Sequence, residues 1–250
     1  MITLWIPKWL GECYSKLYMK FKLGLFTFND AKNVLLFDDN KLSVVFSMLH
    51  SKRLILVFKK SRPRIYRLID PENMIFIASG MVKNFDKVKQ EAYLKLILDC
   101  LRLIMENICL ESFAIYGSVA RGTAYNTSDV DILLISDDFH GTIASRIDSL
   151  IKIEEKLRDE LNWLRKNGIY TGLSFYPLRK VEAEKLPLLF LDLTEEAIVL
   201  YDKNSFLERI LLNFKSKLIE INAKRIFINK KFWYWDLKPN YKFGEKIEID

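Results

Sequence analysis

The stretch Gly117-Ser-Val-Ala-Arg-Gly122, followed by Ser128-Asp-Val-Asp-Ile-Leu133, decides the fold of this 250-residue chain. An apolar run, Ser112-Phe-Ala-Ile-Tyr116, leads into the first glycine, and the second part continues as far as Ile135. Both runs are rich in the branched and aromatic residues that favour buried β-strands. The pattern therefore predicts a strand, a tight turn into a short helix, and a second strand that begins with two aspartates.

The residue types in this stretch suit the binding of a phosphate and a metal ion. Gly117 lets the backbone turn tightly and approach a phosphate closely. Ser118, at the start of a helix, can offer its hydroxyl and nearby backbone N–H groups to phosphate oxygens, and Arg121 can add a charged fork to a triphosphate. Asp129 and Asp131 are two apart on a strand, so they share a face, repel each other and suit a magnesium ion.

These motifs resemble the signature of the minimal nucleotidyltransferases of the DNA polymerase β-like superfamily, and the element order extends the resemblance to residues 85–202. The resemblance implies that Ser118 binds phosphate and that Asp129 and Asp131 bind Mg²⁺ or Mn²⁺. Ser128 is either a nucleotide contact or a turn residue. The implied reaction transfers a nucleoside monophosphate from a nucleoside triphosphate to a hydroxyl. The acceptor would be a protein side chain, such as a tyrosine of a partner toxin, or a nucleic-acid end.

One feature departs from this family pattern. Such enzymes usually hold a third carboxylate on a later strand, here expected at Tyr170-Thr-Gly-Leu-Ser-Phe-Tyr176, and Ser174 stands at that position. A serine is a poor ligand for a hard cation and cannot act as a carboxylate base. A substitute could come from Glu182, Glu184 or Asp192. The alternative function is a nucleic-acid-binding regulator or antitoxin-like protein with a degenerate nucleotide-binding domain.

The net charge of +7 lies wholly in residues 1–80, which hold 13 Lys and Arg against 6 Asp and Glu. A basic excess confined to one segment favours a separate module with a polyanionic partner, DNA or RNA. The same fold could instead serve as a protein-interaction module. The candidate nucleic-acid contacts lie at the end of a helix and along a hairpin: Lys52, Arg53, Lys59, Lys60, Arg62, Arg64 and Arg67.

The element order of this module is expected to be three helices and a hairpin. The helices are predicted near residues 11–22, 29–36 and 40–51, with a short strand at residues 26–28. Two β-rich runs, residues 54–59 and 64–69, flank the basic turn Lys60-Ser-Arg-Pro63. This order resembles a winged helix-turn-helix domain over residues 10–75, with the third helix as the recognition helix.

The remaining chain predicts a mixed α+β domain with helices flanking a mixed sheet. Helices are expected over residues 82–107 and 143–166, and strands over 170–176 and 197–201. Ser205-Phe-Leu-Glu208 predicts a capping box that begins a helix extending to about Phe227. Trp233 and Trp235 are expected to pack the tail onto the domain. The predicted divisions are a winged-helix-like domain (1–80), a transferase domain (81–204), and a C-terminal helix with its aromatic tail (205–250).

Other chemistries find little support in the composition. The three cysteines have no CxxC spacing and the two histidines lie far apart, which argues against a disulfide framework, a zinc site or a Cys/His catalytic pair. No apolar run reaches the roughly 18 residues that a membrane span needs, and no signal peptide is recognisable. A cytoplasmic protein without a membrane partner is therefore expected.

Overall fold

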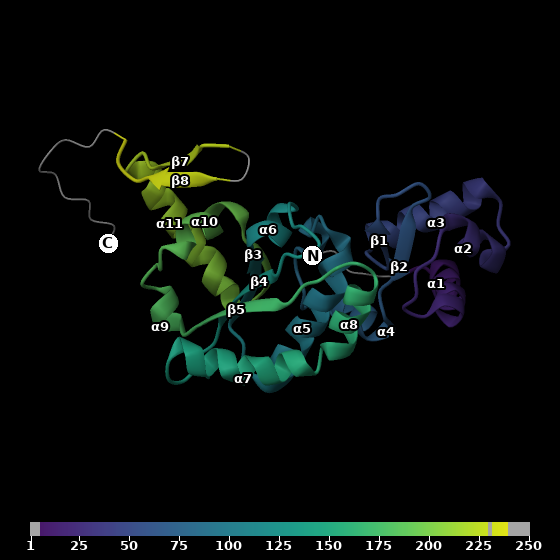
Figure 1. Cartoon of the computed structure of the whole chain (residues 1–250), viewed down its shortest axis with the longest axis horizontal. Helices are drawn as coiled ribbons and strands as arrows, with labels where there is room; N and C mark the ends of the chain where they lie inside the picture. Colours follow the sequence, from purple (N-terminus) through teal and green to yellow (C-terminus); the bar gives the residue numbers. More distant parts are fainter. Residues whose placement is uncertain (1–5, 230–231, 240–250) are drawn as a thin grey trace, which may run out of the picture.

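The structure, a computed structural model, describes residues 6–229 and 232–239, and its centre is a four-stranded sheet of order β5-β4-β3-β6 (Figure 1). β3 (Ser112–Tyr116) pairs antiparallel with both β4 (Val130–Ile135) and β6 (Ile198–Asp202). β4 pairs parallel with β5 (Leu173–Leu178). The sheet is therefore mixed, and together with its flanking helices it confirms the predicted α+β fold.

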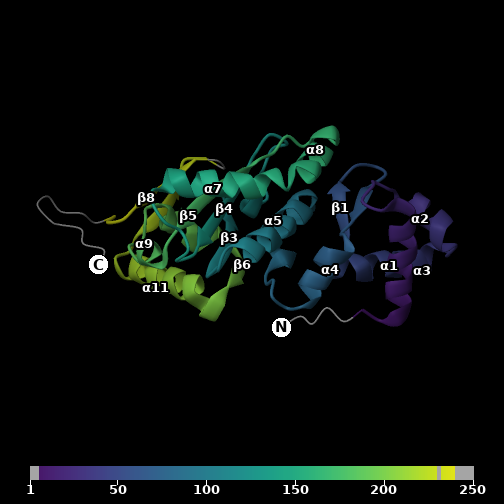
Figure 2. The same ribbon diagram turned by 90° about the horizontal axis from the view of Figure 1, so that it is seen from below.

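Alternating side chains of the central strands enter two separate cores. Phe113 and Ile115 of β3 belong to the core that also contains the buried faces of α5 (Leu94–Asn107), α7 (Ile143–Glu155) and α8 (Arg158–Lys166). Ala114 instead lies in a second core, because successive strand residues point to opposite faces of a sheet. That core is completed by three further helices, α9 (Lys180–Ala183), α10 (Leu189–Glu196) and α11 (Phe206–Glu220). Figure 2 shows the sheet between α7 and α11.

The register of the sheet brings the aspartate-bearing end of β4 between two neighbours. Asp131 lies opposite Tyr116 of β3 and beside Ser174 of β5. β3 ends where β4 begins, so the turn at Gly117 and both aspartates lie at the same edge of the sheet. The strand pairing therefore assembles the predicted motif from its two halves.

Two long helices of the sequence prediction are interrupted. The segment before Leu94 contains the 3₁₀ turns η1 (Phe85–Lys87) and η2 (Glu91–Tyr93) instead of a helix. Its backbone is held against β6, because Lys83 N–H donates to Leu200 and the Asn84 amide donates to Val199. The predicted helix over 143–166 is likewise two helices, which break at residues 156–157.

The N-terminal module has the predicted three helices and hairpin, seen at the right of Figure 1. The helices are α1 (Lys8–Phe21), α2 (Phe28–Leu35) and α3 (Asp39–Ser51), and the antiparallel strands are β1 (Ile55–Lys59) and β2 (Ile65–Leu68). The predicted strand at residues 26–28 is a single bridge from Phe26 to Tyr66, because Thr27 already caps α2. The resemblance to a winged helix stays a prediction.

A buried ion-pair network joins this module to the rest of the chain. The Arg67 guanidinium on β2 donates to both carboxylate oxygens of Glu160 on α8 and lies 3.5 Å from the Trp163 ring centroid. Glu160 also lies 3.4 Å from Lys95 of α5. After β2 the chain continues as α4 (Pro71–Ala78), which contacts α5. One core of buried side chains extends from Leu10 to Leu200, across the predicted division at residue 80.

The C-terminal region differs from its prediction. α11 ends at Glu220, and β7 (Lys224–Phe227) pairs with β8 (Trp233–Asp236) as a hairpin. The predicted capping box is wrong: Ser205 adopts φ +53 without capping, and the Asp202 carboxylate accepts from the N–H groups of residues 207 and 208 instead. Part of the predicted 205–250 segment, residues 230–231 and 240–250, lies outside the described residues. Within the described part, no helix is long and apolar enough to cross a membrane.

Candidate nucleotide and metal site

Gly117 is held directly against one of the two aspartates. It opens the short helix α6 (Gly117–Arg121) with φ +68, a conformation that other residues adopt only with strain. A Cβ atom at this position would lie 2.1 Å from Asp131 Oδ2. The sequence interpretation explained the glycine by the approach of a phosphate, and the structure adds a second reason: only a glycine leaves room for the Asp131 carboxylate.

The two aspartates lie in different surroundings at this edge. Asp131 is half-buried on β4, and burial raises the pKa of its carboxyl, with the Asp129 charge acting in the same direction. A hydrogen bond from Ser174 and the charge of Arg121 lower it. Asp129 is exposed just before β4, and its Oδ1 accepts from Gly172 N–H at 2.8 Å. Two carboxylates that destabilise each other's charge form a place where a cation is stabilised.

The donor set fits a magnesium ion that keeps ligands from water or substrate. Mg²⁺ is often bound by one or two protein carboxylates together with phosphate oxygens. Within residues 6–229 and 232–239, no group of three or more His, Cys, Asp and Glu side chains could hold a metal. Asp129 and Asp131 thus remain the candidate ligands, and Ser174 lies beside Asp131 in the register where the third carboxylate was expected.

A carboxylate that sequence reasoning missed lies near this edge. Glu154 on α7 accepts from Leu173 N–H at 3.4 Å, next to the Gly172 N–H that binds Asp129. Burial and the Asp129 charge raise the pKa of Glu154. No spacing pattern could have revealed it, because α7 reaches the edge only through the parallel pairing of β5 with β4.

The three carboxylates considered as substitutes lie in other contacts. Glu182 binds the buried Arg146 guanidinium at 2.6 and 2.8 Å, which lowers its pKa to about 2. Asp192 accepts from the indole N–H groups of Trp233 and Trp235 at 2.8 and 3.0 Å. These two bonds place the aromatic tail on the domain, as predicted. Glu184 is exposed just beyond α9.

The other predicted nucleotide contacts lie around α6. Ser118 is half-buried at its second position, and its carbonyl accepts from Thr123 N–H. Arg121 donates to both oxygens of Glu196 at 2.8 and 2.9 Å. The Ser128 hydroxyl accepts from Tyr125 N–H at 2.9 Å, the contact of a turn residue. The roles of these residues in nucleotide binding stay predictions.

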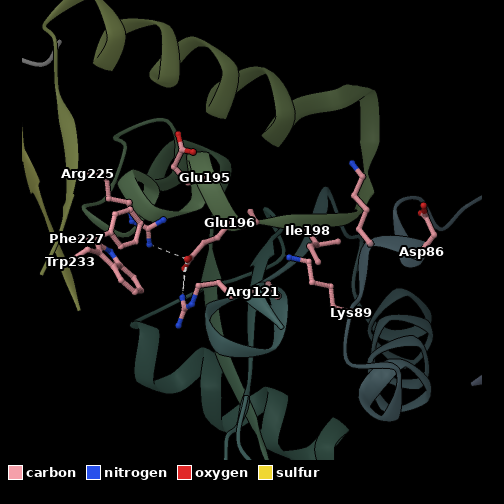
Figure 3. A pocket seen from close by; sticks show the side chains of 12 residues that line it. Asp86, Lys89, Arg121, Glu195, Glu196, Ile198, Arg225, Phe227 and Trp233 are labelled. Carbon is pink, nitrogen blue, oxygen red and sulfur yellow. Dashed lines mark hydrogen bonds and ion pairs between the residues drawn. The ribbon is translucent and has the colours of Figure 1, made fainter. Parts of the chain in front are cut away.

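A cavity of about 630 Å³ lies beside α6. Figure 3 shows Arg121 and Glu196 within it, with Arg225 and Trp233 contributed by the C-terminal hairpin. Arg225 donates to Glu196 at 3.1 Å, so one carboxylate binds two guanidinium groups. Sequence reasoning missed Glu196 and Arg225, because neither lies in a motif and their contact with Arg121 arises only in the folded chain.

The candidate nucleic-acid contacts divide into two groups. Arg67 is 1% exposed and bound to Glu160, so its prediction as a nucleic-acid contact is wrong. Arg53 is also corrected, because its side chain is 14% exposed and its guanidinium is turned to Glu91 and the Asp86 carbonyl. Lys52 is half-exposed after α3. The exposed cations of the hairpin tip are Lys59, Lys60, Arg62 and Arg64.

Comparison with known proteins agrees with the motif. A family described as nucleotidyltransferase domain matches residues 94–189. A solved toxin–antitoxin structure with AMP-PNP is 18% identical, with 50% of this chain and 92% of that chain covered and a TM-score of 0.33. The toxin–antitoxin MntA-HepT is 15% identical, with 50% and 90% covered and a TM-score of 0.30. None of the curated proteins matches the sequence. Residues 94–189 of this chain form a nucleotidyltransferase domain.

Proposed function

We propose that the chain transfers a nucleoside monophosphate from a nucleoside triphosphate to a hydroxyl acceptor and releases pyrophosphate. The observation that carries this proposal is the contact of Gly117 with Asp131, within a domain that matches the nucleotidyltransferases. It places the turn that begins α6 against the candidate metal ligands. A phosphate bound at this turn would therefore lie next to them.

The residues of the site divide the work of the reaction. Asp129 and Asp131 would hold Mg²⁺ or Mn²⁺, which when bound neutralises phosphate charge and orients the triphosphate for in-line displacement. Ser118 and Arg121 would bind phosphate oxygens. The acceptor oxygen bonds to the α-phosphorus, the bond from that phosphorus to the bridging oxygen breaks, and the acceptor gives up its proton.

We assign the acceptance of that proton to Glu154. Ser174 cannot take the role, since a serine hydroxyl is not a base near neutral pH. Glu154 is a half-buried carboxylate on the β5 side of the aspartates, the side where the resemblance places the third carboxylate. Its raised pKa makes it a better proton acceptor than an ordinary exposed carboxylate.

The acceptor is proposed from the basic hairpin. Lys59, Lys60, Arg62 and Arg64 project from the tip of β1–β2 and suit the phosphates of DNA or RNA. A nucleic-acid end is therefore the favoured acceptor, and a protein hydroxyl is the other outcome that an assay has to distinguish.

Transfer of label from α-labelled triphosphates tests the proposal. The intact chain is incubated with each triphosphate and Mg²⁺ or Mn²⁺, together with DNA and RNA of defined ends and candidate protein acceptors. We expect label on one acceptor class, and none in the Asp129→Ala plus Asp131→Ala variant. Binding of triphosphate without transfer to any acceptor in a broad panel would contradict the enzyme proposal.

A second function is favoured by the position of Ser174 beside Asp131. A transferase domain without a third carboxylate could bind nucleotide without turnover and serve as the sensor of a nucleic-acid-binding regulator. In that case triphosphate would change the affinity of the chain for DNA or RNA, while no label would be transferred. The same panel separates the two functions.

A further inference from the structure

The cavity beside α6 has a wall that the nucleotidyltransferase motif does not include. Its sides are the end of α6, the start of β6, the segment around η1 and the C-terminal hairpin β7–β8 (Figure 3). The hairpin lies outside residues 94–189, the part of the chain that matches the family. This wall is therefore a feature of this chain that the family match does not explain.

The charged side chains of the cavity suit an anion. Four of the lining residues are cationic, Lys87, Lys89, Arg121 and Arg225, and three are acidic. Lys87 and Lys89 are exposed and have no ion pair within the described residues. Of the three acids, Glu195 already pairs at 3.0 Å with a lysine outside the wall. A dianionic or more highly charged ligand would thus meet several uncommitted positive charges.

Arg225 is built into this wall rather than attached to the surface. Its side chain is 12% exposed, and its guanidinium lies 4.0 Å from the Trp233 ring centroid. Asp192 holds both, since it lies 3.3 Å from Arg225 and accepts from the Trp233 indole N–H. The Nε atom of Arg225 is nevertheless buried without a hydrogen-bond partner. Buried donors are nearly always satisfied, so this atom indicates a missing acceptor.

The cavity is continuous with the proposed metal site. Arg121 ends the same five-residue helix that Gly117 begins, and a helix rises about 1.5 Å per residue. The charged wall therefore begins within one or two helical turns of the Asp131 carboxylate that Gly117 contacts. A triphosphate whose α-phosphate lies at the aspartates has its remaining phosphates within reach of this wall.

We propose that the cavity binds the β- and γ-phosphates of the triphosphate, and then the pyrophosphate that leaves. Arg225 from the C-terminal hairpin acts there as a second phosphate-binding arginine beside Arg121, and its Nε donates to a phosphate oxygen. Glu196 positions the two guanidinium groups, because it accepts from both. This inference rests on the proposed function and adds to it the residues that recognise the leaving group.

Calorimetric titrations of the intact chain test the inference with three probes: a non-hydrolysable triphosphate, the matching monophosphate and inorganic pyrophosphate, all with Mg²⁺. In Arg225→Gln we expect the affinity for triphosphate and pyrophosphate to fall about tenfold or more, the effect of a lost charge-assisted hydrogen bond. The affinity for monophosphate stays within about twofold, because that probe does not reach the cavity. Arg158→Gln, an exposed arginine of α8, is the matched control and changes none of the three.

Lys89→Gln keeps the test valid if loss of Arg225 unfolds the hairpin, since Lys89 is exposed and its loss removes charge alone. It should weaken pyrophosphate and triphosphate binding but not monophosphate binding. Equal affinities for all probes in the wild type and both variants would overturn the inference while leaving the proposed function standing. A wild-type chain that binds none of the probes would overturn both.

Discussion

Replacing Gly117 by alanine tests the geometry of the site more sharply than removing a carboxylate. The backbone at this position has φ +68, which costs an L-residue roughly 1–2 kcal/mol. The new Cβ would also lie 2.1 Å from Asp131 Oδ2 and 3.1 Å from its Cγ, inside the contact distance of about 3.5 Å. We therefore expect the Asp131 carboxylate to rotate away and the affinity for Mg²⁺ and triphosphate to fall about tenfold or more.

Gly168→Ala is the matched control. Gly168 has φ +88, so an alanine there carries a similar backbone strain, but nothing lies within 4 Å of the added Cβ. Chemical denaturation should show both variants destabilised by about 1–2 kcal/mol, with an additional loss only for Gly117→Ala. Calorimetry should show weakened metal–triphosphate binding only for Gly117→Ala. Normal binding by that variant, or equal loss in both, would refute the reasoning.

Three further predictions concern other parts of the chain. The pKa of Glu182, lowered to about 2 by Arg146, contributes stability above its ordinary pKa of 4.5 that is lost as pH falls towards 2. The contribution is at most about 3 kcal/mol, reduced by the 28% exposure of the side chain, and denaturation of Glu182→Gln should show a flatter acid dependence; an unchanged curve would contradict it. Glu154→Gln should lower the transfer rate about 10²- to 10⁴-fold at unchanged triphosphate affinity in single-turnover assays, and an undiminished rate would exclude Glu154 as the base. Nucleic-acid binding should lose up to about 0.9 per phosphate contact from its salt slope when the hairpin cations become alanine, and an unchanged slope would remove the interface: Lys59, Lys60, Arg62 and Arg64.

The core of the site could be predicted because its parts are local in sequence. The turn at Gly117 and the pair of Asp129 and Asp131 carry their own strand and turn signals. The alignment of Ser174 with Asp131 followed from the expected order of the strands, and the parallel pairing confirms it. What short spacing and alternation can indicate was therefore visible before the fold was known.

The errors arose where distant segments determine the local structure. Arg67 has the sequence context of an exposed hairpin cation, yet its partner Glu160 lies 93 residues later. The segment before Leu94 has an apolar helical pattern, but its backbone hydrogen bonds go to β6. Glu154, Glu196 and Arg225 belong to no motif and meet the site only through tertiary packing. Patterns of one sequence do not report such contacts.

Binding of a non-hydrolysable triphosphate with and without Mg²⁺ tests the central claim most directly, because it requires no knowledge of the acceptor. The wild type and an Asp129→Asn plus Asp131→Asn variant would be titrated by calorimetry under the same conditions. We expect wild-type binding that strengthens at least about tenfold when Mg²⁺ is present, and a variant that shows no such gain. Binding that is independent of Mg²⁺, or equal in the two proteins, would contradict the assignment of Gly117–Asp131 as a metal and nucleotide site.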